Sequence, residues 1–151
     1  MHRMVNPPNR HDPELEPFWD GTEKDELRVQ RCSACGAVRW PPRPACFRCG
    51  GLEVGWVPAA GCGELYSWTV VARSTLPDFA DQVPYVVGVV ALEGLPVRVI
   101  GRVETDDPWG LQVGIPVTVA FRDHASGVRL PVWLPRARPV GGATGPERRA
   151  M

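Results

Sequence analysis

The chain has 151 residues, of which 44% are hydrophobic and 23% are charged, values typical of a globular protein of about one domain that can bury a core. These proportions exclude a disordered chain and a fibrous repeat. Seventeen basic residues balance 17 acidic ones, and the formal net charge of zero argues against polyanion binding by the chain as a whole.

No stretch of the sequence reaches the roughly 18 apolar residues that a membrane-spanning helix needs. The first residues, MHRMVNPPNRHDPELE, also lack the apolar segment of a signal peptide. We therefore expect a cytoplasmic protein without a membrane segment. Because the cytosol disfavours structural disulfides, cysteines in paired CxxC spacing are expected to bind metal.

Residues 1–26 are predicted to form an N-terminal arm with one short helix. Prolines and asparagines predict extended backbone over about the first dozen residues. From residue 13 to about residue 24, the segment PELEPFWDGTEK places acids in a first helical turn. It also brings Leu15, Phe18 and Trp19 onto one face, the pattern of a short amphipathic helix.

The next segment, residues 27–58, is predicted to be a ribbon that holds two cysteine pairs. ELRVQRC alternates apolar and polar side chains as a half-exposed strand would, and it leads directly into the first pair. After the second pair two glycines turn the chain, and LEVGWVP returns as a second strand.

Residues 59–135 carry the pattern of an all-β domain with five runs rich in β-branched residues. The runs are ELYSWTVVARS, PYVVGVVALE, LPVRVIGRVE, PVTVAFRD and VRLPVWLP. In the third run valines alternate with Arg98, Ile100 and Arg102, so one face is expected to enter a core while the arginines face outward. Five such strands predict a small closed barrel.

Two segments of this region and the end of the chain have signals of their own. TLPDFADQV, residues 75–83, is too long for a tight hairpin and is a candidate binding loop. Glu93 and Gly94 predict a tight turn. The end of the chain, residues 136–151, is rich in Gly, Pro and Arg and is predicted to be a mobile tail.

Two CxxC pairs with ten residues between them form the strongest motif of the chain. The four cysteines are Cys32, Cys35, Cys46 and Cys49. Each pair can bend into a knuckle, with Gly36 or Gly50 where positive φ is needed, and two facing knuckles would surround a Zn²⁺ ion at about 2.3 Å. Four protein ligands leave no position for water, which predicts a structural site.

Iron binding and redox chemistry are the alternatives for this motif. Four thiolates in a tetrahedron accept iron as well as zinc, and a single CxxC at a helix start serves redox reactions. Zinc is favoured because both pairs lie on predicted β-arms and nothing else in the sequence indicates electron transfer. Cys62 has no partner in the motif and is interpreted as a small residue in a turn.

The ribbon segment is also basic, with five arginines and no acid between Leu27 and Leu52. Two interpretations remain open: the arginines offset the anionic zinc–thiolate centre, or they form a face that binds phosphates. Trp40 either packs the ribbon on the barrel or stacks on a ligand.

The order of these features resembles one known family. A helix with PFW, a strand ending in QRC, two CxxCG pairs around WPPR, and then GELYSWTVV, PYVVGVVALEG and GIPVTVAF are similar to the acyl-CoA-associated OB-fold family. The resemblance covers about residues 17–135. It implies a mainly β protein with a short helical arm, a rubredoxin-like zinc ribbon and a C-terminal five-stranded OB-fold barrel, with all four motif cysteines as ligands of a structural zinc ion.

The resemblance further implies a non-catalytic accessory subunit that binds and supports a thiolase-superfamily acyl-CoA enzyme. That enzyme would be a β-ketoacyl-CoA thiolase or a retro-aldolase that cleaves a sterol side-chain CoA thioester, sometimes accompanied by a hot-dog-fold hydratase. The OB fold could help to accommodate coenzyme A. No catalytic residue carries over from the family motif and the sequence shows no convincing nucleophile–base pair, so we expect no enzyme activity of the chain alone.

Candidate contacts to a partner or to coenzyme A follow from residue type, because aromatic side chains are enriched at interface cores and guanidinium groups bind phosphates and acids. The candidates are Phe18, Trp19, Trp40, Arg43, Arg73, Phe79, Tyr85, Arg98 and Arg102. The alternative function is single-stranded nucleic-acid binding, which OB folds with zinc ribbons also perform. Zero net charge and a single lysine argue against it.

Overall fold

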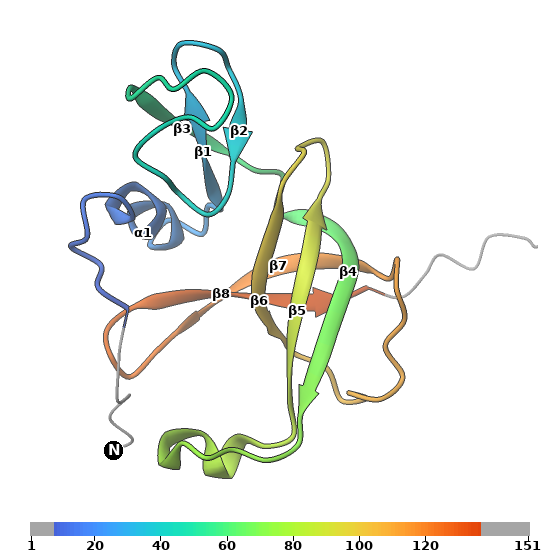
Figure 1. Ribbon diagram of the computed structural model, residues 1–151. Helices are drawn as coiled ribbons and strands as arrows, with labels where there is room; N and C mark the ends of the chain where they lie inside the picture. The colour runs from blue at the N-terminus through green and yellow to red at the C-terminus, as the bar shows by residue number, and fades with distance from the viewer. Residues whose placement is uncertain (1–7, 137–151) are drawn as a thin grey trace, which may run out of the picture.

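The computed structural model describes residues 8–136, in which one short helix leads into a three-stranded sheet and then into a closed five-stranded barrel (Figure 1). The start of the predicted extended arm and all of the predicted tail except residue 136 lie outside the described residues. Within residues 8–136, no helix is both long enough and apolar enough to cross a membrane.

Helix α1 (Glu16–Thr22) is shorter than the predicted helix but lies inside it. It begins with Pro17 in its first turn, where the missing N–H costs nothing, and its last residue, Thr22, donates its hydroxyl to the Trp19 carbonyl at 2.9 Å. The face with Phe18 and Trp19 is buried. Helix α1 contacts both β1 of the ribbon and β8 of the barrel, so it joins the two parts.

The ribbon is a sheet of three antiparallel strands in the order β2-β1-β3. The strands are β1 (Arg28–Cys32), β2 (Val38–Arg39) and β3 (Val54–Pro58). The sequence predicted β1 and β3 but not β2, because two residues are too few to show a period. In the middle of the sheet, Gln30 of β1 faces Arg39 on one side and Trp56 on the other.

The predicted five-stranded barrel is confirmed, with the closed strand order β4-β5-β6-β8-β7. Its strands are β4 (Cys62–Val71), β5 (Tyr85–Leu92), β6 (Arg98–Val103), β7 (Pro116–Asp123) and β8 (Arg129–Pro135). Only the β6–β8 pair is parallel. Alternate residues of β5 and β6 are buried, as the sequence pattern predicted, and the centre of the core includes Leu65, Val90, Val117 and Trp133.

The two connections of the β4–β5–β6 meander lie at opposite ends of the barrel (Figure 1). The loop after β4 contains the 3₁₀ helix η1 (Pro77–Gln82), has no buried residue in that helix and lies at the end remote from the ribbon. The turn at Glu93 and Gly94, with Gly94 at φ 73°, lies at the end nearer the ribbon. The barrel therefore offers two separate ends to ligands or partners.

Candidate functional site

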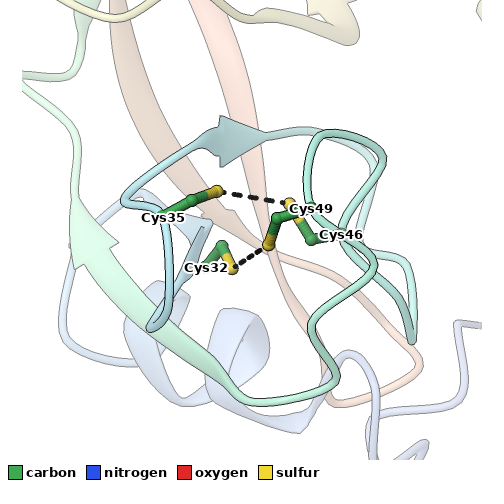
Figure 2. Close-up of side chains that lie close together, drawn as sticks. All are labelled: Cys32, Cys35, Cys46 and Cys49. Carbon is green, nitrogen blue, oxygen red and sulfur yellow. Dashed lines mark hydrogen bonds between the residues drawn. The ribbon is translucent and has the colours of Figure 1, made fainter.

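The four motif cysteines meet at one point of the ribbon (Figure 2). The sulfur atoms of Cys32 and Cys49 are 3.6 Å apart, as are those of Cys35 and Cys46, and all four lie within 4.8 Å of one another. A tetrahedral Zn²⁺ ion with bonds of about 2.3 Å would hold its sulfur ligands about 3.8 Å apart. The observed spacing therefore fits a tetrahedral four-thiolate metal site.

Two equivalent knuckles produce this arrangement. In the first, the Gly36 N–H donates to the Cys32 carbonyl at 3.0 Å, and in the second the Gly50 N–H donates to the Cys46 carbonyl at 2.9 Å. Both glycines have φ of 73°, the left-handed conformation that the sequence predicted for them. The repeated CxxCG motif is thus one local turn that occurs twice and presents its thiols inward.

Hydrogen bonds within the site shift the pKa values of Cys46 and Cys49 in opposite directions. Hydrogen bonds from the backbone N–H groups of Arg48 and Cys49 lower the pKa of Cys46 to about 6. At Cys49 the Gly51 N–H acts in the same direction, but hydrogen bonding with the neighbouring thiols, that of Cys35 first, raises the pKa to about 11. A positive metal ion would remove this competition among thiols and hold all four as thiolates.

The structure places two of the predicted aromatic contacts inside the molecule, packed beside the half-buried Trp40. Phe18 and Trp19 are only 5% and 8% exposed. The Phe18 ring centroid lies 4.9 Å from that of Trp19 and 4.8 Å from that of the half-buried Trp40. In this conformation the apolar face of α1 is covered by the chain itself, so Phe18 and Trp19 pack the helix on the ribbon and leave little surface for a partner.

A second group of predicted contacts meets at the barrel end remote from the ribbon. Phe79 and Tyr85 have ring centroids 5.8 Å apart, and the Arg102 guanidinium lies 5.3 Å from the Tyr85 ring. The same guanidinium donates to the Gln82 side chain at 2.5 Å. These residues line a cavity of about 350 Å³. Arg73 is exposed on the neighbouring loop and does not line this cavity.

The remaining predicted contacts, Trp40, Arg43 and Arg98, line a groove of about 750 Å³ between the ribbon and the β5–β6 turn. The candidate list missed Phe47, which lines the same groove and is 77% exposed. Phe47 lies between the two cysteines of a pair, where a side chain turns away from the metal, and this position was the signal that could have identified it.

Cys62 is isolated from the metal ligands and lies beside a carboxylate. Its Sγ donates to Oε2 of Glu93 at 2.8 Å, and this hydrogen bond, together with burial and the charge of Glu93, raises the pKa of Cys62. A thiol with a raised pKa is a poor nucleophile at neutral pH. The contact supports the interpretation of Cys62 as a structural residue.

Comparison with family models divides the chain within β3, the last strand of the ribbon. Residues 19–55 match the model described as ChsH2, rubredoxin-like zinc ribbon domain. Residues 56–122 match the model described as ChsH2, C-terminal OB-fold domain. The mainly β architecture with a ribbon and an OB fold, implied by the sequence resemblance, is confirmed.

Among individual proteins, a probable enoyl-CoA hydratase alpha subunit from Thermomonospora curvata is 35% identical over 78% of this chain. The matched segment spans 36% of that relative's length, about a third. A DUF35 domain-containing scaffold protein from Methanothermobacter thermautotrophicus is 34% identical, with 66% of this chain and 74% of the relative covered.

A solved structure matches this chain over nearly the full length of the matched chain. A chain of the Ltp2-ChsH2(DUF35) aldolase superposes with a TM-score of 0.76 and 30% sequence identity. The match covers 85% of this chain and 98% of that chain. The fold is therefore shared with a chain of that aldolase structure.

Proposed function

Because this chain belongs to the ChsH2 (DUF35) family, we propose that it is a non-catalytic accessory subunit of a thiolase-superfamily acyl-CoA enzyme. The two family models that it matches are a rubredoxin-like zinc ribbon and an OB fold. The observation that carries the proposal is the similarity over 98% of the chain from the Ltp2-ChsH2(DUF35) aldolase. The scaffold name of the archaeal relative supports a role in assembly.

The metal centre supports a structural role. In the proposed holoprotein Zn²⁺ occupies the four-cysteine site, where the chain supplies every ligand and leaves no position for a reacting water. Zinc would supply only the cross-link between the two knuckles. The four cysteines hold it, and the backbone amides that donate to Cys46 stabilise the thiolate form there.

The proposed partner is a β-ketoacyl-CoA thiolase or a retro-aldolase that cleaves a sterol side-chain CoA thioester. The aldolase name of the matched structure favours the second. A hot-dog-fold hydratase would join the same hetero-oligomer, which the hydratase name of the bacterial relative supports. The complex would act in the cytoplasm.

The cluster of Phe79, Tyr85 and Arg102 is the proposed contact to the partner or to its coenzyme A thioester. It combines two aromatic rings with a guanidinium beside a concave surface, the composition that interface hot spots favour. Gln82 and the Tyr85 ring fix the guanidinium in place, so little side-chain entropy would be lost on binding.

Co-expression with a candidate thiolase-superfamily partner from the same genome tests the proposal. We expect the two to elute together from a sizing column at micromolar concentration. Separate elution at that concentration would refute the accessory-subunit function. Turnover of an acyl-CoA by the purified chain alone would refute the non-catalytic part.

A matched pair of variants tests the contact cluster. Phe79→Ser should weaken co-elution, whereas Leu52→Ser, which changes an apolar residue that is exposed on the ribbon, should not. Equal effects of the two changes would show that the cluster is not the contact.

A further inference from the structure

The groove between the ribbon and the β5–β6 turn is lined by arginine and apolar side chains. Arg39, Trp40 and Arg43 line it from the ribbon, and Leu95 and Arg98 line it from the barrel. None of the described residues that line it is acidic. Its volume of about 750 Å³ exceeds the 350 Å³ of the cavity at the other end of the barrel.

Arg39 is a buried cation without a counter-charge. It is 4% exposed, and its Nη2 donates to the Arg43 carbonyl at 2.8 Å while its Nε donates to the Gln30 side chain. Its Nη1 is buried and has no hydrogen-bond partner in the part of the chain that is described. Both acceptors are neutral, and a buried charge held only by neutral groups is costly unless an anion lies nearby.

The other two groove arginines have exposed side chains, and contacts fix the Arg98 guanidinium and the Arg43 backbone. The β4 strand changes register between Leu65 and Ser67, which leaves Tyr66 on the outer face. The Arg98 guanidinium lies over the Tyr66 ring, 3.9 Å from its centroid. Arg43 is held through its backbone, since its N–H donates to Gln30 at 3.0 Å and its carbonyl accepts from Arg39.

The metal centre has a different arginine beside it. Arg31 lines the same hollow as Cys32 and Cys35 and is therefore placed to offset the charge of the thiolates. None of the three groove arginines lines that hollow. Within residues 8–136 no carboxylate forms an ion pair with Arg39, Arg43 or Arg98.

We propose that this groove is a binding site for the phosphate group of a small ligand, contacted by Arg43 and Arg98 and attracted by the buried charge of Arg39. A phosphate monoester carries a charge of about −1.5 to −2 and three terminal oxygens at neutral pH, whereas a carboxylate has one charge and two oxygens. The positive charges of three arginines that line one groove match the phosphate better. The exposed Phe47 ring offers an aromatic wall to the rest of the ligand.

Calorimetric titration of the purified, zinc-loaded full chain with pyrophosphate tests the proposal. We expect saturable binding that weakens by about tenfold in Arg43→Gln and again in Arg98→Gln, the loss typical of one charge-assisted hydrogen bond. Both side chains are exposed, so neither variant should disturb folding. Arg39 is left unchanged because its burial makes its replacement uninformative.

Arg122→Gln is the matched control, because it removes one exposed positive charge at the opposite end of the barrel. It should change the affinity by less than about twofold, as expected for distant charges in salt. No binding of pyrophosphate at millimolar concentration, or an equal loss in Arg122→Gln, would overturn the proposal. Succinate binding as tight as pyrophosphate would also overturn it, since the groove would then recognise carboxylates.

Two further titrations identify the source of the phosphate. Tighter binding of 3′,5′-ADP than of pyrophosphate, with the difference lost in Phe47→Ala, supports a nucleotide ligand, and equal binding supports free phosphate. If a single-stranded oligonucleotide binds more than about tenfold tighter than 3′,5′-ADP, the site is for nucleic acid and the small-ligand proposal fails.

The site goes beyond the proposed accessory function and stands independently of it. A chain that binds pyrophosphate but elutes apart from the thiolase-superfamily protein would refute only the accessory function. Co-elution without pyrophosphate binding would refute only the phosphate site.

Discussion

Replacing one metal ligand should unfold the ribbon and leave the barrel folded. Cys49→Ser removes the most exposed of the four thiols, while Cys62→Ser removes the one cysteine that lies apart from the metal centre in the described structure. We expect the first variant to lose its zinc and the second to keep about one zinc per chain.

The free energy that the ribbon would lose with its zinc is large because few other interactions order the two knuckles. Each knuckle fixes about five backbone residues, and at about 1–2 kcal/mol per residue the pair costs on the order of 10–20 kcal/mol in conformational entropy. Zinc binding to such peptides contributes about 10–16 kcal/mol. The ribbon strands have five, two and five residues, so their hydrogen bonds alone cannot replace the metal.

Metal analysis measures the zinc content of each variant, and hydrogen exchange measures the folding of the ribbon and of the barrel separately. In Cys49→Ser, residues 32–58 should lose protection, whereas β5 and β8 should keep it because Val90 and Trp133 are buried inside the barrel. A Cys49→Ser protein with full zinc content and unchanged protection of residues 32–58 would refute this reasoning. Equal zinc loss in Cys62→Ser would refute the assignment of the ligands.

Two further predictions concern the barrel. A Cβ atom at Gly88 would lie 2.6 Å from Val103 Cγ2, so Gly88→Ala should cost about 1–3 kcal/mol and lower the Tm by about 2–4 °C per kcal/mol. Gly55→Ala is its control, because there the nearest atom is 3.8 Å away, and an equal loss in both would contradict the packing argument. Glu93 raises the pKa of Cys62, so less of this thiol is ionised at pH 8 than in a free cysteine, and its alkylation should be slow. Glu93→Gln removes the negative charge and should speed alkylation at pH 8; an unchanged rate would show that Glu93 does not control the thiol.

The ribbon motif and the barrel strands could be predicted from the sequence because their signals are local. A CxxCG repeat places two thiols on one side of a turn whatever surrounds it, and Gly36 and Gly50 adopt the predicted positive φ. The alternation of valines with Arg98 and Arg102 likewise assigns the two faces of β6 without knowledge of its neighbours.

The apolar face of α1 shows what a local sequence pattern cannot predict. The sequence identified Phe18 and Trp19 as one apolar face, but a pattern cannot tell whether the chain itself or a partner covers that face. The structure covers it with the ribbon, through the contact of Phe18 with Trp40. The strand β2 was missed for a related reason, since two residues pair only because β1 is already beside them.

The sequence by itself determined which four cysteines form the candidate metal site, the order of ribbon and barrel, and the alternation of the strands, all of which depend on residues close together in the chain. Only the tertiary structure decided which arginines line the same groove. Arg39 and Arg43 belong to the ribbon and Arg98 to the barrel, and they line one groove because folding brings the β5–β6 turn beside the ribbon. Burial and long-range proximity depend on how distant segments pack, and no local pattern contains that information.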